Sequence, residues 1–270
     1  MKTFGFAGLM VVLSFVVAGC ATNPVTGQRQ LSFISESQEI KMGADAAPEF
    51  EQQFGGRVPN EKLQQYVTDL GMKLANLSER PKLPWTFVVL KSDIPNAFAL
   101  PGGKVFVTAG LMTSLTNERQ LASVLGHEIG HVCAMHSVTG MQRAMGAEAF
   151  AMLIEKASGN ESYGTATKVA GQMVVLKYGR DDEYQADALG IKYMEKAGYN
   201  PWGMVETLQF LMTLGEEGGR LDELFQTHPL SSERVKAAHN NVTKNYASYH
   251  TGTPDPNEAR FRQMQALCPK

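Results

Sequence analysis

The segment around residues 117–137 constrains the fold more than any other part of the sequence. Its apolar residues recur at the three- and four-residue intervals of an α-helix, and Asn117 before Glu118 is a typical helix start. Two histidines and a glutamate interrupt this apolar pattern as His127-Glu128-Ile129-Gly130-His131. We therefore predict a buried helix whose packing must also accommodate these polar side chains.

The spacing of the two histidines predicts a metal site. Residues four apart lie on one face of a helix, so His127 and His131 can direct ring nitrogens at the same ion. Glu128 lies about 100° around the helix axis and can hold a water molecule bound to that metal. The alternative is a chance match on an ordinary amphipathic helix. A catalytic zinc site has a third protein ligand, so that ligand provides an independent check.

Three residues are candidates for the third ligand. His136 follows His131 by five positions, which on a continuous helix turns it away from the shared face. We predict that His136 is a polar residue at the helix end and not a ligand. His228 stands before Pro229, and on sequence alone it is a loop histidine without a function.

Glu183 is the third candidate, and it lies at the start of a second predicted helix. Glu183 and Asp187 are four apart and share a face, so one carboxylate can bind the metal while the other accepts a hydrogen bond from a ligating histidine. A solvated acidic helix start is the alternative. The small, apolar continuation Ala188-Leu189-Gly190 favours a buried face.

The paired motifs resemble those of a zinc metallopeptidase family that includes HtpX and the CAAX prenyl proteases. They are most similar to its periplasmic lipoprotein branch of LoiP- and BepA-like proteins. The resemblance extends over roughly residues 21–245. It includes Asn23-Pro24-Val25-Thr26-Gly27, Asn96-Ala97-Phe98-Ala99, Thr227-His228-Pro229 and Ser232-Glu233-Arg234.

The resemblance implies a role for each matching residue. One Zn²⁺ per chain would be held by His127, His131 and Glu183, although such ligands also bind other divalent metals. Glu128 would be the general base. His228 would lie near the metal, where it either stabilises the oxyanion or occupies the open coordination position in a resting state. Asp187 and Arg234 would support the ligands from behind.

The resemblance also implies the reaction and the partners. We expect a metalloendopeptidase that hydrolyses unfolded or misassembled cell-envelope proteins, as in periplasmic and outer-membrane protein quality control. The alternative is a chaperone-like binding factor that assists assembly of outer-membrane proteins and keeps its protease activity latent. Outer-membrane assembly factors are therefore possible partners. A third hypothesis, a purely structural domain, would require that no metal binds.

The first 19 residues predict a lipoprotein signal peptide. Lys2 precedes the apolar run 4–18, and Val17-Ala18-Gly19-Cys20 resembles a lipobox. A spanning helix is the alternative, but the run is shorter than the about 20 residues that spanning requires. We expect lipidation at Cys20 and a periplasmic location. The residue after Cys20 is Ala21 and not Asp, which by resemblance to bacterial sorting signals favours the outer membrane. Ordinary signal cleavage is the main rival.

The remaining pattern predicts an α+β fold that is mainly helical, and the resemblance implies that it is zincin-like. We expect a tether over 20–34, a single metallopeptidase domain over 35–250 and a loosely attached tail over 251–270. Ser35 with Gln38 predicts a capping box, and an apolar stripe predicts a helix over 60–77. Further helices are predicted over about 139–157, 163–178, 180–197, 203–214 and 232–247.

Strand signals precede the histidine motif. The run 85–90 is rich in β-formers, and the runs 96–100 and 104–108 flank Pro101-Gly102-Gly103, which predicts a hairpin. This predicts a small sheet. If the hairpin strand is an exposed edge, a substrate backbone could add to Asn96, Ala97, Phe98 and Ala99 as a further strand.

Charge and cysteine content limit the remaining functions. The formal net charge is −2, with 25 basic and 27 acidic residues, so nothing supports a nucleic-acid partner. The 43% of hydrophobic residues are enough for a packed core. Cys133 and Cys268 could form a disulfide in the cell envelope, or Cys133 could be a buried core residue.

Overall fold

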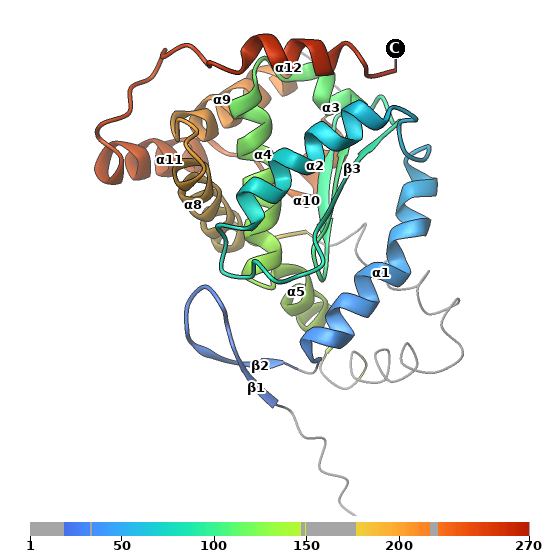
Figure 1. Ribbon diagram of the computed structural model, residues 1–270. Coiled ribbons are helices and arrows are strands. Elements are labelled where there is room, and N and C mark those ends of the chain that lie inside the picture. Colours follow the sequence, from blue (N-terminus) through green and yellow to red (C-terminus); the bar gives the residue numbers. More distant parts are fainter. Residues whose placement is uncertain (1–18, 33, 147–148, 150–176, 217–220, 270) are drawn as a thin grey trace, which may run out of the picture.

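The computed structural model describes residues 19–32, 34–146, 149, 177–216 and 221–269 (Figure 1). The described residues form a mainly helical α+β domain with a small mixed sheet beside a central helix, as predicted. The signal segment 1–18, most of the predicted helix 163–178 and the end of the predicted helix 139–157 lie outside the described residues. None of the described helices combines the length and the apolar character needed to cross a bilayer.

The sheet contains the predicted hairpin. Strands β4 (Ala97–Leu100) and β5 (Lys104–Thr108) pair antiparallel, and β3 (Thr86–Leu90) pairs parallel with the other side of β5. Gly102 and Gly103 in the connecting turn have φ values of 73° and 92°, which favour glycine. The strand order β3-β5-β4 leaves one side of β4 without a strand partner among the described residues.

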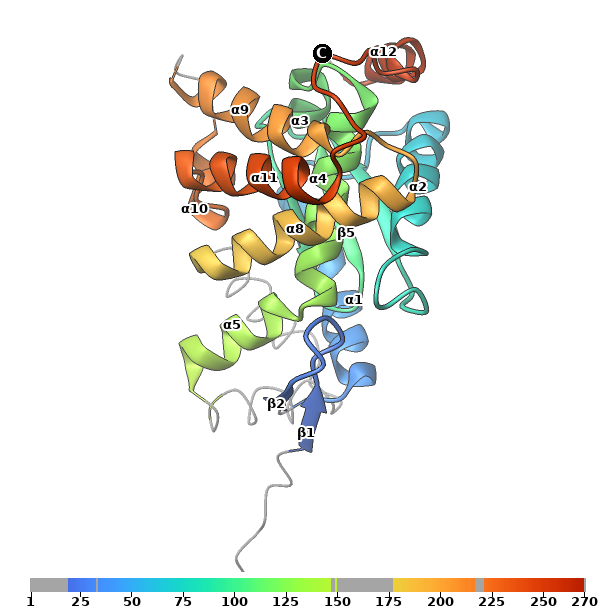
Figure 2. The ribbon, with the colours of Figure 1, turned by 90° about the vertical axis from the view of Figure 1, so that its left-hand side faces the viewer.

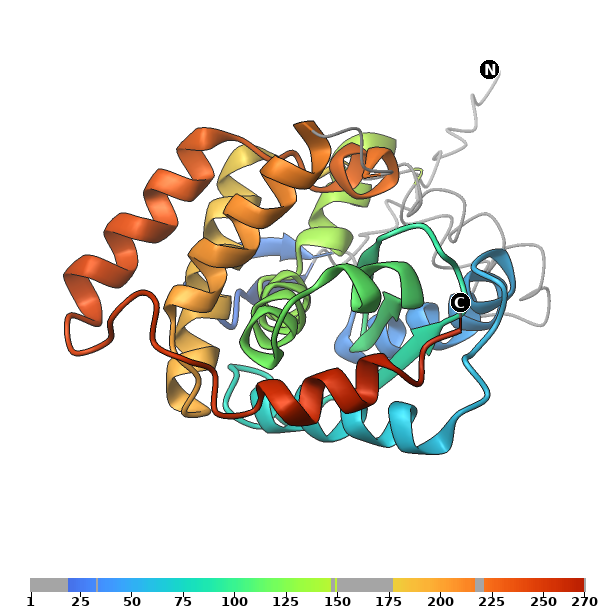
Figure 3. The same ribbon diagram turned by 90° about the horizontal axis from the view of Figure 1, so that it is seen from above.

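The helix predicted at residues 117–137 is α4 (Glu118–Cys133), and all of its residues are buried. In Figure 3 it is seen nearly end-on, with α8 (Arg180–Lys196), α9 (Trp202–Glu216) and α11 (Ser232–Asn245) on one side and the sheet on the other. A Cβ atom at Gly130 would lie 3.1 Å from the Cα of Ala186. Small residues at this crossing therefore let α8 approach α4 closely.

The first two helices begin where the sequence predicts. Ser35 and Gln38 form the reciprocal capping box of α1 (Glu36–Gln53). The predicted stripe of α2 (Glu61–Ala75) is buried in the core. The shorter helices are α3 (Ala109–Ser114), α5 (His136–Met145) and α10 (Asp222–Thr227). Figure 2 shows α5 below α8, and α10 beside α9 and α11.

The region predicted as a tether contains regular structure. Strands β1 (Gly19–Thr22) and β2 (Arg29–Ser32) form an antiparallel hairpin. In the hairpin loop, the amide of buried Asn23 donates a hydrogen bond to the carbonyl of Ala134 at 3.2 Å. The chain after Cys20 is therefore docked on the end of α4 within a few residues.

The prediction of a loosely attached C-terminal tail is wrong. Helix α12 (Glu258–Gln265) packs on α2 and α4, with Phe261 completely buried and Met264 and Cys268 nearly so. These residues recur at helical spacing, and Gly252, Pro254 and Pro256 upstream obscured that stripe. Cys133 and Cys268 are both buried free thiols, so they do not form the disulfide that was considered.

Candidate metal centre

Four buried side chains from separate elements converge on one point. His127 and His131 come from α4, Glu183 from the first turn of α8, and His228 follows α10. Each offers one ligand atom, and these atoms all lie within 4.8 Å of one another. The structure thus brings together the three predicted ligands and adds the histidine that only the family resemblance had suggested.

The spacing of the donor atoms fits a tetrahedral metal ion. Nε2 of His131 lies 3.0 Å from Nε2 of His127 and 3.2 Å from Oε1 of Glu183. Nδ1 of His228 lies 3.3 Å from Nε2 of His127 and 3.0 Å from Oε1 of Glu183. Donors at the usual zinc distances of about 2.0–2.1 Å from a tetrahedral centre lie about 3.3 Å apart. The side chains therefore already have the arrangement that a divalent ion requires.

A carboxylate orients the His127 ring from the side that faces away from the donor cluster. Its Nδ1 lies 2.9 Å from Oδ1 of Asp187, and because a carboxylate only accepts, Nδ1 carries the proton. Nε2 then keeps its lone pair for a metal. Arg234 on α11 donates to both oxygens of Asp187, at 2.9 and 2.7 Å, and also contacts Glu183. Asp187 and Arg234 thus each contact a proposed metal ligand.

The helix that carries His131 does not continue to His136, as the prediction for His136 had assumed. Helix α4 ends at Cys133, Met135 has a left-handed φ of 61°, and α5 starts anew at His136. This break brings Nδ1 of His136 to 2.9 Å from Nδ1 of His131, and Nε2 of His136 to 2.9 Å from Oε1 of Gln185. His136 is outside the donor cluster but contacts a member of it directly.

Tyr178 is a site residue that the sequence analysis missed. Its ring stacks on that of His131 with centroids 4.0 Å apart, and its hydroxyl lies 2.8 Å from the hydroxyl of Ser137. Its backbone N–H donates to the carbonyl of Thr227, next to His228. Neither Tyr178 nor Gln185 belongs to a sequence motif, because the residues that they contact are distant in sequence.

The two buried glutamates have opposite electrostatic environments. Burial raises the pKa of Glu128 above its ordinary value, and its Oε2 has no hydrogen-bond partner among the described residues. Burial would also raise the pKa of Glu183, but His228 and His131 hold it well below its ordinary value. Glu183 is therefore suited to remain an anion beside a cation, and Glu128 is suited to accept a proton.

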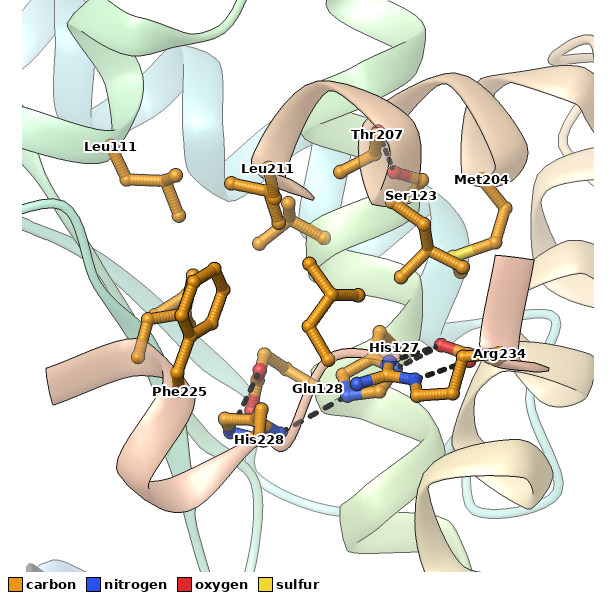
Figure 4. Close-up of a pocket in the computed structure, with 16 residues that line it drawn as sticks. Leu111, Ser123, His127, Glu128, Met204, Thr207, Leu211, Phe225, His228 and Arg234 are labelled. Atoms are coloured by element: carbon orange, nitrogen blue, oxygen red, sulfur yellow. Dashed lines mark hydrogen bonds and ion pairs between the residues drawn. The ribbon is translucent and has the colours of Figure 1, made fainter. Parts of the chain in front are cut away.

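Two cavities flank these side chains. The larger, of about 490 Å³, lies between β4 and α1 and is lined by Phe50, Phe54, Asn96, Phe98, Ala99, Tyr178 and His228, among others. The smaller, of about 50 Å³, lies between α4, α9 and α10. Figure 4 shows Glu128, His228 and His127 along one side of the smaller cavity. Both cavities reach His228, so the donor cluster lies at their junction.

Sequence comparisons now decide the family. The model of peptidase family M48 matches residues 61–242, which include every member of the donor cluster. The chain belongs to peptidase family M48. This M48 chain is 30% identical over 237 residues to the beta-barrel assembly-enhancing protease of Escherichia coli (strain K12), which is 83% of the chain and 47% of that relative.

Two further relatives of this M48 chain carry metallopeptidase names. The chain is 30% identical to the mitochondrial metalloendopeptidase OMA1 of Schizosaccharomyces pombe over 218 residues, which are 79% of this chain and 64% of that one. It is 34% identical to the metalloprotease YcaL of Escherichia coli (strain K12) over 152 residues, which are 55% of this chain and 58% of that one. The chain spans about half the length of the beta-barrel assembly-enhancing protease that it matches.

Proposed function

We propose that this M48 protein is a zinc-dependent metalloendopeptidase. The observation that carries the proposal is the convergence of two imidazoles and a carboxylate, at tetrahedral donor spacing, beside a buried glutamate whose Oε2 has no hydrogen-bond partner among the described residues. His127, His131 and Glu183 would hold the zinc ion. When bound, zinc lowers the pKa of a water molecule and polarises the scissile carbonyl.

Glu128 moves the proton in this mechanism. Its unpartnered Oε2 accepts the proton of the attacking water and later delivers it to the leaving amine. Arg234 and Asp187 keep the ring of His127 in the orientation that leaves its Nε2 unprotonated.

The open edge of β4 would bind the substrate. In the antiparallel ladder Asn96 accepts from Thr108 at 3.0 Å, and ladder bonds alternate, so the backbone groups of Ala97 and Ala99 face away from β5. An extended peptide could pair with them as an added strand. The large cavity beside Phe98 and Ala99 leaves room for that peptide. Folded proteins do not offer such a strand, so unfolded or misassembled proteins are the proposed substrates.

His228 would keep the enzyme latent in its resting state. Its Nδ1 lies within the donor cluster, in the position that a water molecule and the scissile carbonyl would need. Two roles were open from the resemblance, and these distances favour occupancy of the fourth position over oxyanion binding. Substrate would then have to displace His228 before hydrolysis.

The proposed location is the periplasmic side of a bacterial outer membrane, with a lipid anchor at Cys20. The signal-like sequence before Cys20 and the similarity to a relative named for β-barrel assembly support this. Misassembled outer-membrane proteins are then the substrates. The same similarity favours a second candidate function, an assembly factor with latent proteolysis. Labelling with radioactive palmitate tests the anchor, since Cys20→Ser should abolish incorporation.

Metal analysis and cleavage of unfolded casein test the main proposal. Wild-type protein should contain one zinc ion per chain and cleave casein, and a chelator should stop the cleavage. The Glu128→Gln variant should retain zinc and lose cleavage. Zinc without cleavage in either protein would favour the assembly factor. Absence of bound zinc would overturn the proposal.

A further inference from the structure

The smaller cavity beside Glu128 belongs to none of the functions described above. We propose that it receives one short aliphatic side chain, of valine or leucine size, from a substrate residue that adjoins the scissile bond. This inference rests on the proposed endopeptidase activity and names the sequence feature that the site selects. It depends on where the cavity opens, on the chemistry of its wall and on its size.

The cavity opens at the reacting atoms. His127, Glu128 and His228 line one side of it, and Ala97, the first residue of the proposed substrate-binding strand, lines another. A peptide paired with β4, with its scissile bond at the metal, therefore has a neighbouring side chain at the mouth. In Figure 4 the apolar residue Leu211 lies across the cavity from these polar groups.

The wall of the cavity includes apolar residues and two hydroxyl-bearing residues whose hydrogen bonds are made within the protein. Ser123 and Thr207 are its hydroxyl-bearing residues, and their hydroxyl oxygens lie 2.6 Å apart. Each hydroxyl also has a main-chain acceptor at 2.8 Å, the carbonyls of Gln120 and Gly203 respectively. The apolar part of the wall comprises Ala97, Leu111, Val124, Met204, Leu208, Leu211, Leu224, Phe225 and Leu230.

Two of the charged residues at the cavity are committed to each other, while Glu128 lies at its mouth with an Oε2 that has no hydrogen-bond partner in the described part of the chain. Arg234 and Asp187 bond to each other, and Asp187 further accepts from His127. Beyond Glu128, a polar or charged side chain would therefore lose its hydration on entry without gaining a hydrogen bond, which is unfavourable. An aliphatic side chain has no such loss. The chemistry of the wall thus selects for side chains without polar atoms.

The size of the cavity separates aliphatic from aromatic side chains. Its volume is about 50 Å³, whereas a leucine-lined protein cavity of about 150 Å³ accepts benzene. A phenyl ring would therefore require the wall to move, and protein interiors resist such overpacking. The cavity of about 490 Å³ on the β4–α1 side imposes no comparable limit. The two sides of the cleft should therefore discriminate side chains very differently.

The proposal can be tested with a series of peptides that share one sequence except at a residue beside the cleaved bond. At that position the peptides carry Ala, Val, Leu, Phe or Lys. The wild-type protein reports the bond that is cleaved and the kcat/KM of each peptide. The zinc-loaded Glu128→Gln variant reports the affinity of each peptide without cleavage. We expect Val and Leu to exceed Phe and Lys about 10-fold or more in both measurements, as is usual for selection by an apolar pocket.

Shortening a side chain of the wall enlarges the cavity and should change this selection. Leu211→Ala should raise kcat/KM for the Phe peptide relative to the Leu peptide, while Leu214→Ala, on the same helix but outside the cavity, should not. If Leu211→Ala fails to fold, Leu211→Val should produce a smaller change in the same direction. Equal use of Leu and Phe, or equal effects of the two helix variants, would overturn the inference. Loss of all cleavage with retained selective binding to Glu128→Gln would instead contradict only the proposed function.

Discussion

The Nδ1 atom of His136 lies 2.9 Å from the Nδ1 atom of His131, so the residue that follows the break between α4 and α5 contacts a proposed metal ligand. If Nε2 of His131 binds the metal, its Nδ1 carries a proton and donates it to His136. The Nε2–H of His136 in turn donates to Oε1 of Gln185 at 2.9 Å. This chain of bonds fixes the tautomer and the ring plane of His131.

Substitution of His136 tests this chain of bonds. His136→Leu removes the acceptor and should weaken zinc binding about 10–100-fold, as is usual for loss of such a partner. His136→Asn retains an acceptor oxygen near the place of Nδ1 and should restore most of the affinity. Competition with a chromogenic chelator measures both. Equal affinities for the Leu and Asn variants would contradict this role.

Asp187 should have the same importance for His127. Asp187→Asn weakens the acceptor for Nδ1–H of His127 and leaves Arg234 without its carboxylate, so zinc affinity should fall about 10–100-fold. Asp181→Asn is a matched control, because Asp181 is exposed in the first turn of the same helix. A chelator titration in which both variants behave alike would rule out the role of Asp187.

His228→Ala should increase cleavage of unfolded casein. The substitution removes the side chain that lies in the fourth donor position, while His127, His131 and Glu183 remain as ligands. Initial rates at saturating zinc provide the measurement, with His228→Ala combined with Glu128→Gln as the inactive control. A large decrease in rate, with zinc still bound, would instead assign His228 to oxyanion stabilisation.

The edge of β4 can be tested with proline. Ala99→Pro removes an N–H that faces away from β5, so it should weaken substrate binding without breaking the sheet. We expect a raised KM for casein and unchanged zinc content. Ala99→Val, which keeps the N–H, controls for side-chain bulk. A proline variant that cleaves casein as well as the valine variant would show that substrate does not pair with this edge.

The C-terminal helix should stabilise the domain. Phe261 is completely buried against the core, so Phe261→Ala should lower the free energy of unfolding by about 3–5 kcal/mol. Arg262→Ala, at an exposed neighbouring position, should have little effect. Urea denaturation followed by circular dichroism measures both. A loss below about 1 kcal/mol for Phe261→Ala would mean that α12 is only weakly attached.

Features that depend on local spacing could be predicted from the amino-acid sequence alone. The four-residue intervals within His127–His131 and Glu183–Asp187 follow from helix geometry, because each pair lies on one continuous helix. The β4–β5 hairpin likewise follows from two short β-rich runs around adjacent glycines. These features depend only on neighbouring residues, so they can be predicted without knowledge of the rest of the fold.

How these helices and strands meet depends on the packing of the whole fold. The contact between His136 and His131 could not be predicted from helical rotation because the chain breaks at Met135, and Tyr178 carries no motif because its partners lie on other segments. The position of His228 in the donor cluster and the small cavity beside Glu128 both depend on how α4, α9 and α10 pack. Packing joins residues that are far apart in sequence, and no local spacing encodes such contacts.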